Sequence, residues 1–250
     1  MIKITDDLAT GWKSAVYGMR NPMNSWNNID STFDPLKIGE NDLTLMKKLA
    51  LAGSDHAKYR RMIVVYADIT APLYWWKEFD TYKVSTVANS CSTMHKIHEK
   101  EFTFEDFSTE HLLEPKDVFD ESFEPYSGMN IRDAVELASY KPIVITGVDD
   151  RWVMPFTPSG VLVLTINMLN KCRELYLETK DKKYWWQMIQ LLPSSYNQLR
   201  TVMLNYEVLS RIYFARHNHK LDEWHDFCKW IESLPYASDI IFPTKEETDE

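Results

Sequence analysis

The last third of the chain is organised as a series of helices, and this feature restricts the fold more than any other. Apolar residues recur there at helical spacing, and polar capping residues or prolines separate one run from the next. The pattern predicts helices over residues 159–179, over 181–192, from 194 or 195 to about 217, and from 222 to just before Pro235. A chain with this arrangement is expected to have a helix-rich fold.

A smaller β component precedes this region. Residues 61–70 are rich in β-branched side chains and predict a buried strand, and residues 142–158 predict a further strand and a loop. Helices are predicted over residues 41–52 and 73–82, whereas the first forty residues are polar and irregular. We therefore expect an α+β fold, a helix-rich domain with a small central sheet, spanning residues 1–250 as a single domain.

Charge is distributed unevenly along the chain. The 37 acidic and 28 basic residues give a net charge of −9, which argues against nucleic-acid binding through phosphate neutralisation. Residues 99–124 hold ten acidic residues and two lysines, and we expect an acidic insertion at about residues 99–145. Because residues 245–250 contribute a further −3, the rest of the chain carries about +2 by subtraction. That balance is compatible with a locally positive pocket for an anionic small molecule.

Several common classes of protein are not expected. The three cysteines lie far apart without a CxxC pair, which favours a reducing cytoplasm, and the longest apolar run, residues 161–166, is too short to span a membrane. Neither a GxGxxG nor a GxxxxGK[ST] pattern occurs. The histidine groups at residues 95–98 and 217–225 lack the partners of a metal site. We expect a cytoplasmic protein that binds neither metal nor membrane.

Asn205 and Arg216 stand at the two ends of one stripe of the predicted long helix. They are eleven residues apart, about three turns or ~16 Å, and Leu209 and Ile212 continue the stripe between them. An amide, a guanidinium and apolar residues between them suit an extended nucleotide. The same spacing is also that of a core-facing stripe with a polar residue at each margin. Judged by spacing alone, this second interpretation is favoured.

Two further segments concentrate polar side chains. His56 lies in the basic run Ser54-Asp-His-Ala-Lys-Tyr-Arg-Arg61, which is suited either to phosphate or to a solvated turn. Residues 77–83 and 89–95 crowd hydrogen-bonding groups after an aromatic helix, although turns use the same residue types.

These spacings together resemble those of the flavin-dependent thymidylate synthases. That family carries an FEH-type histidine, a segment A-P-[hydrophobic]-F…RQW-x-RHR leading into SxNExSxRY, and a C-terminal LP…N-x-R…R pattern. Here His56 is followed at matching spacing by Ala71-Pro-Leu-Tyr-Trp-Trp-Lys-Glu-Phe-Asp-Thr-Tyr-Lys83, and Asn89 and Ser92 fit NxxS with one extra residue. Pro193, Asn205 and Arg216 reproduce the C-terminal spacing without a gap. The resemblance covers about residues 43–98 and 185–235.

The resemblance implies a reaction and its cofactors. Members transfer a one-carbon unit from methylenetetrahydrofolate to dUMP and reduce it with hydride that passes from NADPH through FAD. They are homotetramers whose sites are shared between subunits and use no cysteine nucleophile. The resemblance therefore implies a methyltransferase of nucleotide biosynthesis with a small-molecule nucleotide substrate. The divergent pattern with its insertion looks like variants in bacteriophages, which would place the protein in a host cytoplasm.

Roles for individual residues follow from the same resemblance. Ser92, Lys83 and Tyr82 would form the catalytic group. The flavin would be bound by one set of residues, namely His56, Lys83, Asn89, Asn205 and Arg211. The nucleotide would be bound by Arg216, Ser92 and Arg20.

The sequence departs from the family pattern at charged positions. The RHR triplet is Thr81-Tyr82-Lys83, the arginine of SxRY is Met94, and the arginine two residues after Asn205 is Glu207. Compensating cations are expected among Lys58, Arg60, Arg61 and Arg20. The alternative function is a catalytically altered or inactive homologue that binds a nucleotide or acts as an interaction protein.

Overall fold

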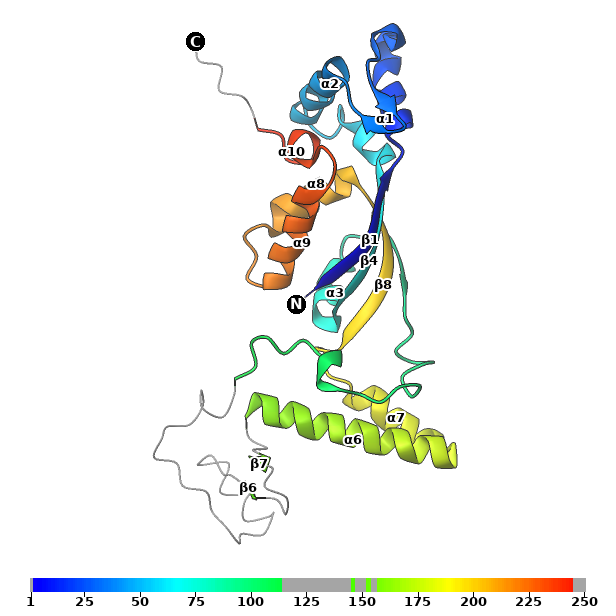
Figure 1. Ribbon diagram of the computed structural model, residues 1–250, viewed down its shortest axis with the longest axis vertical. Coiled ribbons are helices and arrows are strands. Elements are labelled where there is room, and N and C mark those ends of the chain that lie inside the picture. The colour runs from blue at the N-terminus through cyan, green and yellow to red at the C-terminus, as the bar shows by residue number, and fades with distance from the viewer. Residues whose placement is uncertain (1, 114–144, 147–151, 154–156, 245–250) are drawn as a thin grey trace, which may run out of the picture. The chain divides into compact units, whose positions relative to one another are not determined.

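The computed structural model describes residues 2–113, 145–146, 152–153 and 157–244 of the chain (Figure 1). These residues belong to two compact units, the first formed by Met1–Cys91 with Gln198–Glu250 and the second by Ser92–Asn197. Most of the expected acidic insertion, residues 114–144, lies outside the described residues. A single domain with an insertion at about 99–145 therefore stays a prediction.

The first unit is built on a four-stranded sheet with the order β1-β4-β8-β5. β1 (Lys3–Thr10) pairs antiparallel with β4 (Val64–Pro72), and β5 (Val87–Ser90) pairs antiparallel with β8 (Asn197–Asn205). Burial alternates along β4, where Val65 is enclosed and Tyr66 is exposed. One face of the sheet therefore packs against a core, as in antiparallel sheets with one solvated side.

The described helices of this unit are α1 (Trp12–Arg20), α2 (Glu40–Leu51), α3 (Leu73–Phe79), α8 (Tyr206–Arg216), α9 (Asp222–Ser233) and α10 (Ala237–Ile240). In Figure 1, α3, α8 and α9 lie beside one face of the sheet, whereas α1 and α2 lie beyond one end of its strands. Short elements fill the connections: η1 (Asn21–Met23), η2 (Trp26–Asn28), β2 (Thr32–Phe33), β3 (Leu36–Lys37) and η3 (Lys58–Met62). The combination of helices with a small antiparallel sheet confirms the predicted α+β fold.

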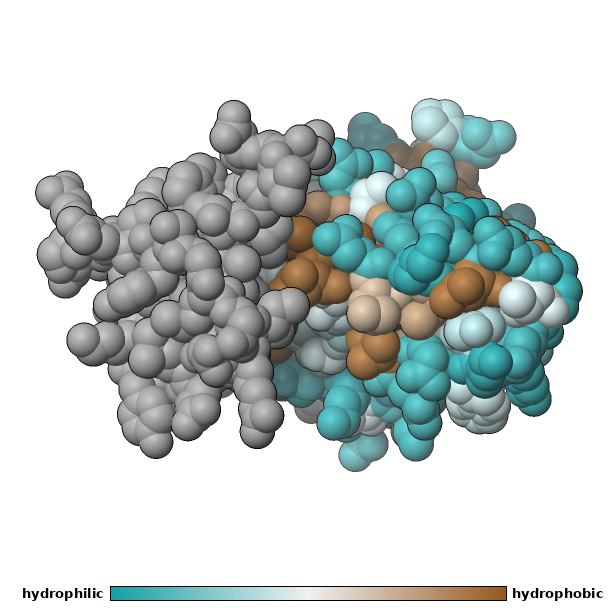
Figure 2. Space-filling model, turned by 90° about the horizontal axis from the view of Figure 1, so that it is seen from below, coloured by the Kyte–Doolittle hydropathy of each residue, from teal (hydrophilic) through white to brown (hydrophobic). Residues whose placement is uncertain are grey.

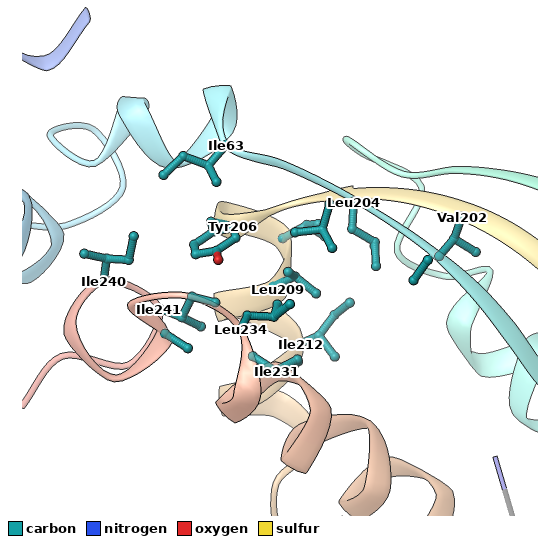
Figure 3. Close-up of a cluster of buried hydrophobic side chains, with 14 of the residues drawn as sticks. Ile63, Val202, Leu204, Tyr206, Leu209, Ile212, Ile231, Leu234, Ile240 and Ile241 are labelled. Atoms are coloured by element: carbon teal, nitrogen blue, oxygen red, sulfur yellow. The ribbon is translucent and has the colours of Figure 1, made fainter. Parts of the chain in front are cut away.

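The core of the first unit joins the sheet to α3, α8 and α9. Figure 3 shows aliphatic side chains from these elements pointing toward one another, among them Leu204 of β8, Ile212 of α8 and Ile231 of α9. A second part of the same core is aromatic, because Trp75 contacts both Trp224 and Phe227 at ring-centroid distances of 4.8 and 5.5 Å. Such rings bury large apolar areas and stabilise the docking of α3 on α9.

The second unit has a core of its own. It contains η4 (Phe104–Asp106), β6 (Ile145–Thr146), β7 (Trp152–Val153), α6 (Pro158–Thr179) and α7 (Lys182–Leu191). Leu169 of α6 and Met188 of α7 are fully buried in it. Thr157 caps α6 and Asp181 caps α7, each by accepting a backbone N–H, which explains why both helices were predictable.

Part of α6 presents apolar side chains to solvent. Val161, Leu164 and Met168 are exposed and recur every three or four residues, so they share one face of the helix. Figure 2 shows hydrophobic surface interspersed with hydrophilic surface on this side of the molecule.

Two predictions of secondary structure are wrong. The long helix expected from residue 194 or 195 to 217 is a strand, β8, followed by the shorter helix α8. Burial in β8 alternates, with Gln198, Val202 and Leu204 inside, and this is the period of a strand. The first forty residues are also ordered, since they form β1 and α1. β1 is polar and exposed because it lies at the edge of the sheet and is held by its backbone pairing with β4.

Candidate functional site

A pocket of about 860 Å³ lies beside α1 and α2 in the first unit. Its lining includes the predicted residues Arg20 and His56 together with Lys58 and Tyr59. The side chains of His56 and Lys58 are exposed and make no hydrogen bond or ion pair with any described residue. The volume lies within the range of small-molecule and cofactor sites, about 300–1,000 Å³. The pocket therefore offers two available nitrogen groups to a ligand.

Arg20 takes a structural role at the edge of this pocket. It is 4% exposed, and its Nε donates to Oδ1 of the fully buried Asp42 at 2.7 Å. The other oxygen of Asp42 accepts from the backbone and the hydroxyl of Ser31. Separating a buried ion pair costs about 3–5 kcal/mol, so this guanidinium is poorly placed to exchange its partner for a nucleotide. Its predicted role as a substrate ligand stays a prediction.

Tyr59 supplies a neutral hydroxyl to the same region. Burial is the largest effect on this group and raises the pKa of Tyr59 well above its ordinary value. The hydroxyl donates to the carbonyl of Met46 at 2.8 Å and anchors η3 on α2. The phenol therefore stays protonated and does not act as a base at neutral pH.

Of the cations expected to compensate for lost arginines, Arg60 is enclosed in the fold. It is 6% exposed, and its Nη1 lies 3.6 Å from a carboxylate oxygen of Glu207 and 3.4 Å from the hydroxyl of Ser210. Glu207 stands where the family pattern has an arginine, so this position now neutralises Arg60. Arg61 is exposed.

A second pocket, of about 430 Å³, lies where α3 ends and β5 and β8 pair. It is lined by Lys83, which the sequence singled out, and by Arg200, which it did not. The prediction of one helix from residue 194 or 195 to about 217 conceals Arg200, because that segment begins with the strand β8. Strand alternation from the buried Gln198 would have placed residue 200 on the inner face of the sheet.

Arg216 and Tyr82, two residues of the predicted site, contact each other. Nε of Arg216 donates to the hydroxyl of Tyr82 at 2.8 Å, and its Nη1 donates to Oε2 of Glu78, also at 2.8 Å. The guanidinium carbon lies 4.7 Å from the ring centroid of Trp224, whose Nε1 donates to the same Glu78 oxygen at 3.0 Å. His219 Nε2 lies 3.5 Å from that oxygen. Arg216 is therefore held inside its own chain by a carboxylate, a phenol and an aromatic face.

The middle of the stripe from Asn205 to Arg216 faces the core. Leu209 and Ile212 are fully buried in the core, and Figure 3 shows them directed at other apolar side chains. Asn205 is 6% exposed, and its Oδ1 accepts the N–H of Val208 at 2.9 Å as the N-cap of α8. The middle of the stripe thus faces the core, as the second interpretation predicts, whereas ligand binding by Asn205 and Arg216 stays a prediction.

The remaining predicted residues lie in separate places. Asn89 is exposed on β5 opposite Thr201, and Arg211 is exposed on α8. Ser92 belongs to the second unit, where its hydroxyl oxygen accepts the N–H groups of Met94 and His95 at 3.2 and 2.9 Å. This turn occupies the acceptor sites of Ser92 and leaves its proton available to a ligand.

Metal and membrane features were searched over the described residues alone. No three histidine, cysteine, aspartate or glutamate side chains gather there in a way that suits a metal ion. Among those residues, no helix is both long and apolar enough to cross a bilayer.

The architecture was compared with those of known proteins. No protein-family model matches the sequence, and no curated protein does. Solved structures match it over nearly their whole length. Thymidylate Synthase X (ThyX) from Helicobacter pylori, solved with FAD and dUMP, has 16% identity and a TM-score of 0.59, with 97% of both chains covered. The UMP/dUMP methylase PolB from Streptomyces cacaoi, bound with 5-Br UMP, has 13% identity and a TM-score of 0.54, with 97% of this chain and 92% of PolB covered.

The chain has the fold of the flavin-dependent thymidylate synthases and of the UMP/dUMP methylase PolB. The resemblance drawn from the sequence is confirmed at the level of fold. At these identities the likeness is one of architecture, and function depends on the site.

Proposed function

We propose that this protein is a flavin-dependent methyltransferase that converts dUMP to dTMP. FAD is its cofactor, methylenetetrahydrofolate its one-carbon donor and NADPH its reductant, and the working form is a homotetramer in a cytoplasm. The observation that carries the proposal is the fold match over 97% of this chain and 97% of a thymidylate synthase solved with FAD and dUMP.

Some, but not all, of the predicted flavin-binding residues have side chains available to an anionic flavin. His56 lines the larger pocket, Lys83 lines the smaller one, and Asn89 and Arg211 are exposed, so each is free to hold a phosphate or a ring heteroatom. Asn205 does not fit this role, because its amide oxygen already caps α8. Bound reduced flavin would supply hydride, and nearby positive charge favours its reduced form.

The nucleotide would be oriented by hydroxyl groups. Ser92 can donate its proton to a carbonyl of the uracil ring, since both backbone bonds it makes use its oxygen as acceptor. The phenol oxygen of Tyr82 likewise accepts from Arg216, so its O–H remains a possible donor to the nucleotide. A homotetramer would bring residues of different subunits to one ligand, as the sequence resemblance implies.

A second candidate function has a specific observation in its favour. Arg216, the predicted nucleotide ligand, is paired with Glu78 and stacked on Trp224 within its own chain. Such a pair is expected in a homologue that kept the fold and lost or altered the reaction.

A tritium-release assay distinguishes the two functions. The full-length protein is incubated with dUMP tritiated at C5, FAD, NADPH and methylenetetrahydrofolate, and tritium in water and dTMP are both measured. The proposed methyltransferase releases tritium and forms dTMP in equal amounts, and omission of the folate abolishes both. Protein that takes up FAD and dUMP but produces neither tritiated water nor dTMP supports the altered homologue.

A further inference from the structure

Arg200 is held in a fixed orientation at the smaller pocket. Its Nε donates to Oε1 of Gln198 at 3.0 Å, and its guanidinium carbon lies 4.3 Å from the ring centroid of Trp76. Gln198 is itself fixed, since it donates from Nε2 to the carbonyl of Cys91 at 2.7 Å and accepts from Nε1 of Trp76 at its own carbonyl at 2.9 Å. Trp76 is fully buried, so the arginine rests on a rigid support.

The guanidinium still has donors to offer. Its Nη1 donates to Oδ1 of Asp80 at 2.8 Å, while Nη2 makes no hydrogen bond to any described residue. An arginine stacked on an aromatic ring and fixed at Nε presents the planar fork that matches phosphate oxygens. Little conformational entropy remains to be lost when an anion binds, because the side chain is already ordered.

The charges around the pocket favour an anion. Arg200 and Lys83 contribute two positive charges and Asp80 one negative charge, and Lys83 has no ion-pair partner within the described part of the chain. The side chain of Asp80 is 52% exposed, whereas that of Arg200 is 15% exposed. An ion pair with such an exposed carboxylate contributes little to stability, so a doubly charged phosphate can displace Asp80 from the arginine.

This pocket also explains how a lost charge can be replaced. The RHR triplet is reduced to Thr81-Tyr82-Lys83, while Arg20 and Arg60 are buried in pairs with acidic residues. Arg200 reaches the neighbourhood of Lys83 from β8, a different part of the sequence.

We propose that Arg200 and Lys83 form a binding site for the phosphate of a nucleotide. The ligand is the monophosphate of a uridine nucleotide or the diphosphate of a flavin dinucleotide, which share this chemistry. The inference rests on the proposed function for the identity of these ligands, and it adds a binding residue that the resemblance does not supply.

Titration with inorganic pyrophosphate tests the site directly. Isothermal titration of the full-length protein at fixed low salt is carried out on the wild type and on Arg200→Gln, Lys83→Gln, Asp80→Asn and Lys77→Gln. Loss of charge-assisted hydrogen bonds weakens binding about tenfold or more in Arg200→Gln and Lys83→Gln. Removal of the competing carboxylate in Asp80→Asn tightens binding about two- to fivefold. Lys77→Gln is the matched control, since this exposed lysine of α3 lies outside the pocket lining, and it stays within about twofold of wild type.

Misfolding would weaken binding, so tighter pyrophosphate binding by Asp80→Asn supports the site even if the Arg200→Gln variant is damaged. Wild-type protein that does not bind pyrophosphate, or an Arg200→Gln variant that binds it as tightly as wild type, overturns the site.

Titrations with dUMP and with FAD then identify which nucleotide supplies the phosphate, because the affinity for one of them falls in Arg200→Gln. If wild type and Arg200→Gln bind both ligands equally, the site is wrong and the proposed function stands. If wild type binds neither ligand but shows Arg200-dependent pyrophosphate binding, the proposed function is wrong and the anion site stands.

Discussion

The pairing of Glu78 with Arg216 can be measured by a double-mutant cycle. Their side chains are 36% and 19% exposed and 2.8 Å apart, which places the pair between an exposed and a buried salt bridge. Exposed pairs contribute about 0–1 kcal/mol, and breaking buried ones costs about 3–5 kcal/mol. We therefore expect a coupling free energy of about 1–2 kcal/mol between Glu78→Gln and Arg216→Gln, obtained from urea unfolding of the wild type, both single variants and the double variant.

The control cycle combines Glu78→Gln with Arg211→Gln, because Arg211 is an exposed arginine on the same helix. Its coupling is expected to lie within about 0.3 kcal/mol of zero. A similarly small value for the cycle with Arg216 refutes the reasoning, since Arg216 would then be free to bind a ligand. The affinity of Glu78→Gln for dUMP tests the functional role of Arg216. This affinity rises if Arg216 contacts the nucleotide, because the competing carboxylate has been neutralised.

Three further predictions follow from caps, burial and titration. Asn205→Ala removes the bond to Val208 and lowers the free energy of unfolding by about 1 kcal/mol, measured by chemical denaturation. Leu169→Ala, in the core of the second unit, costs about 2–5 kcal/mol, whereas Met168→Ala on the exposed face of the same helix stays within about 0.5 kcal/mol; equal losses would contradict that core. Burial raises the pKa of Cys228 from 9.0 to about 11, so stability falls as the pH rises through that interval; an identical pH profile in Cys228→Ala would contradict this.

Helices with local signals were predictable from the sequence. Asp181 is the N-cap of α7, Pro72 directly precedes α3, and α9 carries apolar residues at helical spacing from Trp224 to Ile231. Asp181 caps α7 with its side chain, whereas the starts of α3 and α9 are marked by Pro72 and by the acidic residue Asp222 in the first turn, each within a few residues of the apolar positions. The physical cause is therefore contained in the segment itself.

Strands that depend on distant partners were not predictable in the same way. β8 lies between β4 and β5, and its pairing residues are more than a hundred positions away in the chain. The residues that follow Pro193 are compatible with the period of a helix and with that of a strand until those partners are known. The local pattern alone therefore predicts one continuous helix. β1 has few apolar residues and becomes a strand through pairing with β4.

Only part of the candidate site can be predicted from the sequence, because some of its contacts join residues that are far apart in the chain. His56 stands out as a histidine in a basic run, and Lys83 as the remaining cation of a triplet. The partner of Arg216 could not be inferred, because Glu78 lies 138 positions earlier and looks like an ordinary helix residue. Arg200 was hidden by the wrong helix assignment, since its orientation follows from the strand.

Uptake of flavin by the purified protein tests the central claim most directly. The full-length chain is purified, saturated with FAD, separated from free cofactor by gel filtration, and examined by its visible absorption spectrum. A flavin spectrum that comigrates with the protein, and changes on addition of dUMP, is the predicted result. A colourless protein that retains no FAD at saturating cofactor contradicts the proposed flavoenzyme.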